Sequence, residues 1–271
     1  MVNAITVVKL GGTQGLDFSA ICADAAALLA EGRRLVMVHG GSSEANSLGE
    51  ALGKPPRFIT SPSGYTSRYT DRATLEVFAM AVNGKVNTLL VEQLRGLGVN
   101  AIGLSGLDGG LLQATRKDSI QSVEQGKRKL VRDDYTGKIE HVNAGLLEML
   151  VNAGYVPVIA PLAVSGKGEA LNVDADRAAA MIASALRAET LILLTAVPGL
   201  MRNFPDESSL IRQVPQSQIQ SALEAAQGRM KKKILGAQEA LLGGVDRIVI
   251  GDGRIARPIT IALNGQGTVI E

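Results

Sequence analysis

The sequence contains few of the side chains on which several common functions depend. Its 271 residues include one cysteine, two histidines and no tryptophan, and aromatic residues make up 3%. The single cysteine, Cys22, excludes a disulfide framework and a cysteine-rich metal site, and its alanine neighbours favour a buried thiol. With only His39 and His141, we expect neither a histidine zinc site nor a Ser-His-Asp triad. The lack of aromatic faces argues against carbohydrate or single-stranded nucleic-acid binding.

Charge and hydropathy exclude further classes of protein. A net charge of +2 does not indicate nucleic-acid binding. No apolar run reaches the roughly 18 residues of a membrane span. The first predicted strand begins within four residues of Met1, which leaves no room for a signal peptide. We therefore expect a cytoplasmic protein, whose 46% of hydrophobic residues can bury a large core as one domain or two lobes.

What the sequence does contain is a repeated alternation of strand and helix patterns. Its first half predicts strands at 5–9 and 34–38 and helices at 17–31 and 43–52. Such alternation is typical of βαβ units, in which helices cover both faces of a parallel sheet. We expect an α/β fold, a three-layer αβα sandwich with a mainly parallel central sheet.

The pattern continues along the chain with one interruption. Thr70 or Asp71 can cap a long helix that reaches about residue 97. Residues 113–141 then alternate with the short period of antiparallel strands, and Gln125-Gly126 is typical of a hairpin turn. Further strands are predicted at 101–104, 155–160, 190–194, 246–250 and 267–270, and further helices at 143–153, 174–187 and 227–242.

The first predicted strand places a lysine where burial is expected. Lys9 follows a run of β-branched residues, and an unpaired charge in such a strand is costly. Gly11 and Gly12 come next and can bring backbone amides close to a ligand. A lysine beside such amides favours an anion site. The alternative is that Lys9 reaches solvent from the end of the strand.

A second glycine turn follows the strand at 34–38. There His39-Gly40-Gly41-Ser42 leads into a helix. Two such turns at the carboxyl ends of neighbouring strands would face one crevice, which is where open α/β sheets bind ligands. The chain has no GxxxxGK[ST] sequence and no complete dinucleotide fingerprint. A nucleotide site in this chain would therefore be of another kind.

Basic residues gather at two places in the first half of the chain. Arg68 stands before a helix, where a guanidinium can hold a carboxylate, although a surface ion pair would give the same pattern. The predicted hairpin region carries more basic residues, which fit either a solvated hairpin or docking of an acidic partner. The residues that we assign to docking are Arg116, Lys117, Lys127 and Arg128.

Two charged positions in the second half are less easily explained as solvated surface. Asp176 begins a helix after Asn172, and a carboxylate in a first turn beside buried residues can hold a lysine ammonium. Lys233 ends a run of three lysines at a helix N-terminus, which the helix dipole disfavours. We interpret Lys231 and Lys232 as a solvated basic turn, because they cannot share a face with Lys233 and its apolar neighbours.

In this order, these motifs resemble the amino acid kinase superfamily over essentially the whole chain. They are KxGG at 9–12, HGG at 39–41, Arg68 before a helix, NxDxD at 172–176 and GxMxxK at 228–233. Within it, the chain is most similar to the acetylglutamate kinase family, in the branch that phosphorylates 2-aminoadipate or glutamate whose amine is masked by a small acidic amino-group carrier protein. Two kinds of feature point to that branch. Ser42 replaces the third glycine of the usual HGGG, and the other cues are segments 66–72, 103–109 and 134–138.

The resemblance implies a carbamate kinase-like fold and an ATP-dependent kinase that makes an acyl phosphate in lysine or arginine biosynthesis. ATP would be the co-substrate, with Mg²⁺ carried by its phosphates and no metal held by protein side chains. The attacking carboxylate is already ionised at neutral pH, so positioning and electrostatics must supply most of the rate. An N-lobe at about 1–165 would bind the amino acid and form a homodimer, and a C-lobe at about 166–271 would bind the nucleotide.

The motif matches also imply a role for each site residue. Lys9 would neutralise the nucleophile and the transferred phosphoryl group, Lys233 would neutralise the β- and γ-phosphates, and Asp176 would orient both lysines. Gly11 and Gly12 would donate amides. The acceptor amino acid would be held by Gly41, Ser42, Arg68 and Asn172. The nucleotide would be lined by Thr195, Val197, Gly199, Leu200, Gly228 and Met230.

Two positions depart from the pattern, and two alternatives stay open. Ser42 changes the close-packed glycine turn, and Ala196 stands where the superfamily commonly has aspartate, which leaves ribose and metal contacts there unassigned. The chain could act on free N-acetylglutamate, or it could be a non-catalytic nucleotide or amino-acid sensor, although a sensor has no need of two phosphate-neutralising lysines. Aminoadipate and glutamate differ by one methylene, worth only about 1–3 kcal/mol of discrimination.

Overall fold

Eight strands form the central sheet of the computed structural model. They are Ile5–Leu10 (β1), Arg34–His39 (β2), Ala101–Ser105 (β5), Val156–Ala160 (β10), Thr190–Thr195 (β13), Gln213–Val214 (β14), Arg247–Asp252 (β15) and Thr268–Ile270 (β16). Their order across the sheet is β14-β16-β15-β13-β1-β2-β10-β5, and every neighbouring pair is parallel except β15 and β16. The structure describes residues 4–12, 15–62, 64, 66–116, 119–124, 127–226 and 228–271. The predicted α/β fold with a mainly parallel sheet is confirmed.

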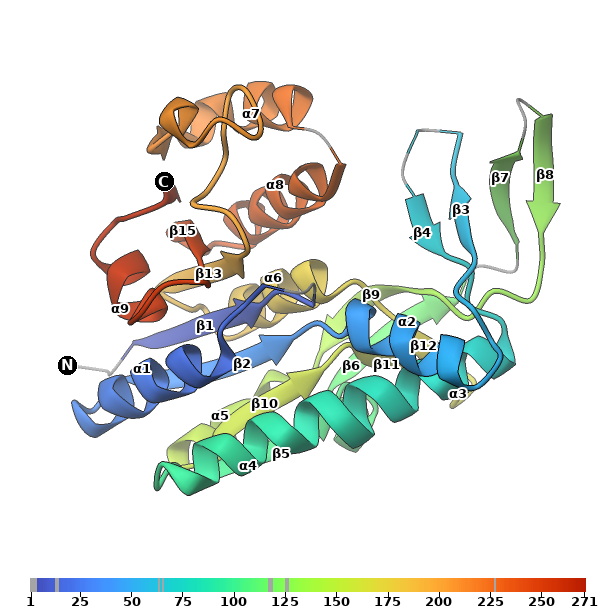
Figure 1. Ribbon diagram of the computed structural model, residues 1–271. Coiled ribbons are helices and arrows are strands. Elements are labelled where there is room, and N and C mark those ends of the chain that lie inside the picture. The colour runs from blue at the N-terminus through green and yellow to red at the C-terminus, as the bar shows by residue number, and fades with distance from the viewer. Residues whose placement is uncertain are drawn as a thin grey trace.

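Helices cover both faces of this sheet, because successive side chains of a strand point to opposite sides (Figure 1). Val8 of β1 packs with residues of α1 (Phe18–Ala30), α4 (Thr88–Gly96) and α9 (Pro258–Leu263). Val7 belongs to the core on the other face, which α5 (Ala144–Asn152), α6 (Ala175–Ala185), α7 (Ile219–Ala225) and α8 (Gly228–Leu242) cover. Within the described ranges, no helix has both the length and the apolar character needed to cross a membrane.

The long helix predicted after Asp71 is present, but its winding changes midway. Asp71 caps α3 (Arg72–Ala79), a π-helical segment at Met80–Asn87 follows, and α4 completes the run. Asn87 at the end of the π-helical segment is buried, and its side-chain amide donates to Val158 O at 2.8 Å. The apolar periodicity of the sequence indicates the helix but does not reveal this local change of winding.

A smaller sheet and two hairpins lie beyond the central sheet (Figure 1). The smaller sheet has the order β12-β11-β6-β9, formed by Ala170–Asn172 (β12), Leu162–Ser165 (β11), Leu112–Arg116 (β6) and Gly137–Val142 (β9). The hairpins are Phe58–Thr60 (β3) with Thr66–Arg68 (β4), and Ile120–Glu124 (β7) with Lys127–Val131 (β8), and they stand side by side. The predicted antiparallel region is confirmed, while Gln125-Gly126 lies outside the described residues. The helix α2 (Ser42–Ala51) and 3₁₀ turns at Asp108–Gly110, Glu207–Ser209 and Gln216–Gln218 complete the elements.

Candidate active site

Two lysines from distant parts of the chain meet on one carboxylate. Lys9 Nζ lies 2.7 Å from Asp176 Oδ1, and Lys233 Nζ lies 3.0 Å from the same oxygen and 3.2 Å from Oδ2. None of the three residues is more than 9% exposed. The alternative in which Lys9 reaches solvent is therefore wrong. Two ammonium groups on one carboxylate leave a buried net charge of +1, which favours an anion beside them.

Burial and neighbouring charges set the protonation of this cluster. Burial lowers the pKa of Lys233 to about 8, although the charge of Asp176 opposes the shift and that of Lys9 adds to it. Burial alone would raise the pKa of Asp176, but the charges of Lys233 and Lys9 outweigh it and hold that pKa well below its usual range. At neutral pH the cluster therefore consists of an ionised Asp176 and a largely protonated Lys233.

Strand β1 and the helices α6 and α8 bring these side chains together. Lys9 lies on the central strand β1, where it pairs in register with Leu193 of β13 and Val38 of β2. Asp176 lies in the first turn of α6, whose N-cap Asp174 accepts from the amide of Asp176 at 3.0 Å. The carboxylate is thus fixed at a helix N-terminus, where a negative charge is favoured.

A second contact keeps α6 and α8 in register. Arg177, next to Asp176, donates to both carboxylate oxygens of Glu239 on α8, at 2.9 and 2.6 Å. Such a bidentate pair fixes orientation as well as distance. Gly236 of α8 lies against the backbone of Asp176, where an added Cβ would be 3.4 Å from the Asp176 carbonyl oxygen. The close packing of these two helices is what places Lys233 on Asp176.

The two glycine turns meet each other, as predicted. A Cβ on Gly12 would lie 2.3 Å from the amide nitrogen of Gly41, and a Cβ on Gly40 would lie 2.6 Å from Gly12 Cα, so a side chain fits at neither position. The prediction for Gly11 needs correction. Its amide donates to Leu194 O at 3.2 Å, because the pairing of β1 with β13 continues one residue beyond the strand.

His39, at the end of β2, is held in its neutral form. Nδ1 lies 2.6 Å from Gly40 O, which can only accept, so Nδ1 carries the hydrogen and Nε2 accepts from Asn87 Nδ2 at 3.0 Å. Burial lowers the pKa of His39 to about 4. The ring is therefore uncharged at neutral pH, and both of its nitrogens are already used.

Arg68 lies against the N-terminal turn of α2. Its Nη2 donates to Asn46 Oδ1 at 2.5 Å and to Ser42 O at 3.3 Å, and its guanidinium carbon is 5.3 Å from the centre of the Phe58 ring. Among the described residues these partners are neutral, so the charge of Arg68 remains for an anion. Asn46 was not predicted from the sequence, although its position one helical turn after Ser42 was the available signal.

Asn172 joins the same region from β12. Its Nδ2 donates to Thr70 Oγ1 at 3.0 Å, and that hydroxyl donates to Arg68 O at 3.2 Å. The helix N-cap is Asp71, so the sequence reading that offered Thr70 as a cap is corrected. The structure thus connects two predicted acceptor-binding residues, Arg68 and Asn172, through a residue that sequence reasoning did not assign to the site.

The segment proposed to line a nucleotide follows β13. Leu200 is buried, its amide donates to Thr268 Oγ1 at 2.8 Å and its carbonyl accepts from the amide of Ile211 at 2.8 Å. The backbone of Leu200 is therefore held by β16 and the loop at Ile211, and its nucleotide-lining role stays a prediction. Gly199 also packs on Thr268, where a Cβ would lie 2.6 Å from Oγ1. The nucleotide candidates are Thr195, Val197, Gly199, Leu200, Gly228 and Met230.

Lys232 differs from its predicted place in a solvated turn. Its Nζ donates to Thr66 O at 2.9 Å, which joins the first half of α8 to the β3–β4 hairpin. Thr66 lies two residues before Arg68 on β4. The interpretation as a purely solvated residue is therefore wrong for Lys232.

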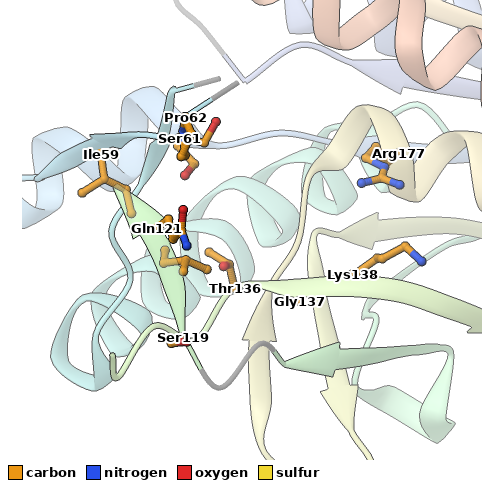
Figure 2. A pocket seen from close by; sticks show the side chains of 11 residues that line it. Ile59, Ser61, Pro62, Ser119, Gln121, Thr136, Gly137, Lys138 and Arg177 are labelled. Carbon is orange, nitrogen blue, oxygen red and sulfur yellow. The ribbon is translucent and has the colours of Figure 1, made fainter. Parts of the chain in front are cut away.

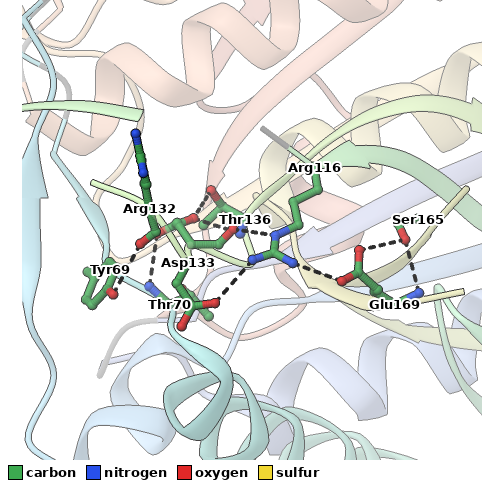
Figure 3. A network of polar contacts seen from close by, with 9 residues as sticks. Tyr69, Thr70, Arg116, Arg132, Asp133, Thr136, Ser165 and Glu169 are labelled. Atoms are coloured by element: carbon green, nitrogen blue, oxygen red, sulfur yellow. Dashed lines mark hydrogen bonds and ion pairs between the residues drawn. The ribbon is translucent and has the colours of Figure 1, made fainter. Parts of the chain in front are cut away.

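The residues predicted to dock an acidic partner divide into two groups. Lys127 and Arg128 are exposed on β8. Arg116 is instead engaged within the protein, where it donates to Glu169 Oε1 at 2.9 Å (Figure 3). Its guanidinium carbon also lies 3.6 Å from the centre of the Tyr135 ring. The charge of Arg116 is therefore shared with internal partners, and its docking role stays a prediction. Lys117 lies outside the described residues.

A cavity of about 390 Å³ opens between the two hairpins (Figure 2). Thr136 and Gln121 line it with polar groups, and the cations Lys138 and Arg177 lie at its other side. In the described part of the chain, no group of three or more His, Cys, Asp and Glu side chains is placed to hold a metal ion.

Sequence comparison finds similar proteins that match nearly the whole chain. A protein named LysW-aminoadipate kinase from Deinococcus radiodurans is 58% identical over 100% of this chain and 92% of its own length. A protein of the same name from Thermus thermophilus is 52% identical over 97% and 99%. An acetylglutamate kinase from Desulfitobacterium hafniense is 37% identical over 97% and 88%.

Solved structures and a family model complete the comparison. An N-acetylglutamate synthase from Neisseria gonorrhoeae superposes with a TM-score of 0.80 at 28% identity, covering 99% of this chain and 59% of that one. A carbamate kinase from Giardia lamblia, at a TM-score of 0.69 and 16% identity over 99% and 98%, shares the fold. The model of the amino acid kinase family matches residues 4–252. The chain therefore belongs to the amino acid kinase family.

Proposed function

We propose that this chain transfers the γ-phosphoryl group of ATP to the side-chain carboxylate of 2-aminoadipate whose amine is masked by a small acidic amino-group carrier protein. The glutamate form of the same carrier is a second acceptor in this proposal. The observation that carries it is the buried cluster in which Lys9 and Lys233 share the single carboxylate of Asp176, which leaves a net positive charge. Relatives named for this reaction support the choice of acceptor.

In the proposed reaction, an acceptor carboxylate oxygen attacks the γ-phosphorus. A new O–P bond forms, the bond to the bridging oxygen of the β-phosphate breaks, and ADP leaves with that electron pair. No proton moves, because the nucleophile is already an anion, and this suits a site in which His39 is neutral and fully bonded. The work of the protein is then to place two anions together and to neutralise them.

Each member of the cluster has a distinct part in this transfer. Lys9 neutralises the attacking carboxylate and the transferred phosphoryl group, while Lys233 neutralises the β- and γ-phosphates. Asp176 holds both ammonium groups in place, and its negative charge offsets their mutual repulsion. Gly12 at the turn donates an amide to the phosphates. Mg²⁺ would be carried by the nucleotide phosphates rather than by protein side chains, and it would supply further positive charge there.

The two substrates approach from opposite lobes in this proposal. The N-lobe, about 1–165, together with Asn172, holds the acceptor, with Arg68 on its carboxylate and with Gly41 and Ser42 at the positive end of α2. The C-lobe, about 166–271, takes ATP against Thr195, Val197, Gly199, Leu200, Gly228 and Met230. A homodimer built on the N-lobe, which the family resemblance implies, stays a prediction that light scattering tests.

The carrier itself is proposed to dock on the β7–β8 hairpin. Lys127 and Arg128 present exposed positive charge there, and an acidic partner would be steered to it. The cavity between the hairpins then receives the arm that bears the amino acid, because polar side chains such as Gln121 and Thr136 line it. Reversing both docking charges, as Lys127→Glu with Arg128→Glu, should raise KM for the carrier substrate and leave KM for ATP unchanged.

An assay of ADP formation tests the proposed function directly. Carrier-linked aminoadipate, carrier-linked glutamate and free N-acetylglutamate are offered at equal concentrations. We expect turnover with the carrier-linked acceptors and little with the free acid. Robust activity on free N-acetylglutamate alone would remove the carrier from the proposal, and ATP binding without turnover of any acceptor would favour a sensor.

A further inference from the structure

A buried carboxylate outside the catalytic cluster holds part of the acceptor site together. Asp134 is 2% exposed, and both of its oxygens accept hydrogen bonds. Oδ2 accepts from the amide of Thr70 at 3.1 Å, and Oδ1 accepts from the amide of Thr136 at 2.8 Å and from the Thr136 hydroxyl. A buried carboxylate that accepts three hydrogen bonds in this way fixes the backbone on both sides of it.

The backbone beside Asp134 makes the next set of contacts. The amide of Tyr135 donates to Thr70 O at 2.7 Å, and Tyr135 O accepts from the amide of Asn172 at 2.8 Å. Thr70 in turn contacts both proposed acceptor-binding residues, since its hydroxyl accepts from Asn172 Nδ2 and donates to Arg68 O. Asp134 and Tyr135 therefore hold Thr70 through its amide and its carbonyl, and Thr70 joins Asn172 to Arg68.

Arg116 anchors this segment from the other side (Figure 3). Its Nε donates to Asp134 O at 2.9 Å, its guanidinium lies over the Tyr135 ring, and Nη1 is 2.9 Å from Glu169 Oε1. The planar face of the guanidinium therefore stacks on Tyr135, while its N–H groups donate to Asp134 O and Glu169. The segment 132–136 is thus fixed between β6 and the acceptor site.

We infer that Asp134 is a positioning residue for the acceptor, which acts by holding Thr70 and thereby sets Asn172 and Arg68. This inference rests on the proposed function, because it deepens the description of the same site. The segment also continues directly from β8, the strand whose exposed cations are proposed to dock the carrier. The docking surface and the acceptor-binding residues are therefore joined by one short, internally bonded segment.

The variant Asp134→Asn tests this inference without changing the shape of the side chain. Each carboxylate oxygen accepts from an amide hydrogen, so the new NH₂ group faces a donor in either orientation. We expect KM for the acceptor to rise about tenfold, with kcat also reduced, while KM for ATP changes less than about twofold. A merely structural role would instead shift the KM values for the acceptor and for ATP together.

The chain offers a matched control in the adjacent residue. Asp133 is exposed, and its contact with Arg116 is long, at 3.4 Å. Its backbone has a positive φ of 60°, which asparagine tolerates. Asp133→Asn therefore makes the same chemical change one residue away, and we expect kinetics like those of the wild type.

A second pair of variants keeps the test independent of how well Asp134→Asn folds. Thr70→Val removes the hydroxyl between Asn172 and Arg68, and Thr70→Ser restores it. We expect Thr70→Val to raise the acceptor KM about tenfold and Thr70→Ser to return it toward the wild-type value. An active wild type with unchanged acceptor KM in Asp134→Asn and Thr70→Val would overturn this inference alone. A wild type inactive on every acceptor would contradict the proposed function and the inference with it.

Discussion

Lys9 and Lys233 contact the same oxygen of one carboxylate, at 2.7 and 3.0 Å. Among the residues that the structure describes, neither ammonium group therefore has a second carboxylate, and Asp176 offsets their mutual repulsion. Because all three residues are buried, this repulsion is larger than it would be on the surface. A phosphate group that entered between them would remove the imbalance, so we expect the cluster to bind an anion.

Asp176→Asn should expose this imbalance. The change leaves two buried cations without a counter-charge, and breaking such a buried pair costs about 3–5 kcal/mol. We expect a lower melting temperature, a kcat reduced by tenfold or more, and a larger stabilisation by ATP or inorganic phosphate than the wild type shows. Thermal unfolding with and without phosphate, together with steady-state rates, measures all three.

Asp174→Asn is the control for that change. Asparagine caps a helix about as well as aspartate, and Asp174 contacts the amides of Asp176 and Arg177 and neither lysine. If both asparagine variants lost stability and rate to the same extent, the lysine pair would not depend on Asp176 in the way described.

The pH dependence of activity should follow Lys233. Its pKa of about 8 means that the cation needed for phosphate neutralisation is lost as the pH rises through that value. We expect kcat/KM for ATP to fall about tenfold per pH unit above pH 8, following a single deprotonation. Lys233→Arg should remove this fall from whatever activity it retains, because guanidinium stays protonated throughout.

Stability should change in the opposite direction over the same range. An unfolded lysine titrates near 10.4, so between about pH 8 and that value the unfolded chain binds more protons than the folded one. The contribution of Lys233 to folding stability therefore rises with pH while activity falls. An alkaline loss of activity that simply follows unfolding would contradict this assignment.

Lys232 should couple the binding of the two substrates. Its contact with Thr66 joins the helix proposed to bind ATP to the hairpin that carries Arg68. In the wild type, bound acceptor should lower the Kd for the nucleotide by some factor. We expect this factor to be a few-fold smaller in Lys232→Met, since one hydrogen bond is worth about 0.5–1.5 kcal/mol. Titration calorimetry with a non-hydrolysable ATP analogue measures the effect. The exposed Lys167, changed to Met, serves as the control, and equal coupling in both variants would contradict the prediction.

His39 should make the protein sensitive to acid. Its pKa is about 4 in the folded state and near 6.5 when unfolded, so the unfolded chain binds the extra proton between these values. Stability is then lost as pH falls from about 6.5 to 4, by at most roughly 3 kcal/mol. Denaturant unfolding at several pH values should show this loss in the wild type and not in His39→Asn. The same substitution at the exposed His141 should leave the loss in place.

The buried cluster of Lys9, Asp176 and Lys233 could be predicted because each of its parts has a local signal. Lys9 interrupts an apolar strand before two glycines, Asp176 opens a helix after an N-cap, and Lys233 opposes a helix dipole. Each signal is a conflict between a residue and its local environment, and such conflicts are expected at functional sites. The alternation of strands and helices likewise fixed the fold class, because its periods follow from backbone geometry.

The contacts that were missed depend on residues far apart in the chain. Arg116 was assigned to docking from its charge alone, yet its partners Glu169 and Tyr135 come from other elements. Lys232 was placed in solvent because its partner, Thr66 O, lies on another hairpin. The amide of Gly11 donates to Leu194 O rather than to a ligand, because the parallel pairing of β1 with β13 extends past the end of β1. In each case tertiary packing, which local pattern does not encode, decided the outcome.

The most direct test of the account compares turnover and ATP affinity in Lys9→Ala. If Lys9 neutralises charge that develops during phosphoryl transfer, the single-turnover rate should fall roughly 100-fold or more while the Kd for ATP rises much less. Equal losses in rate and in ATP affinity would contradict this account and would assign the buried lysine to nucleotide binding alone.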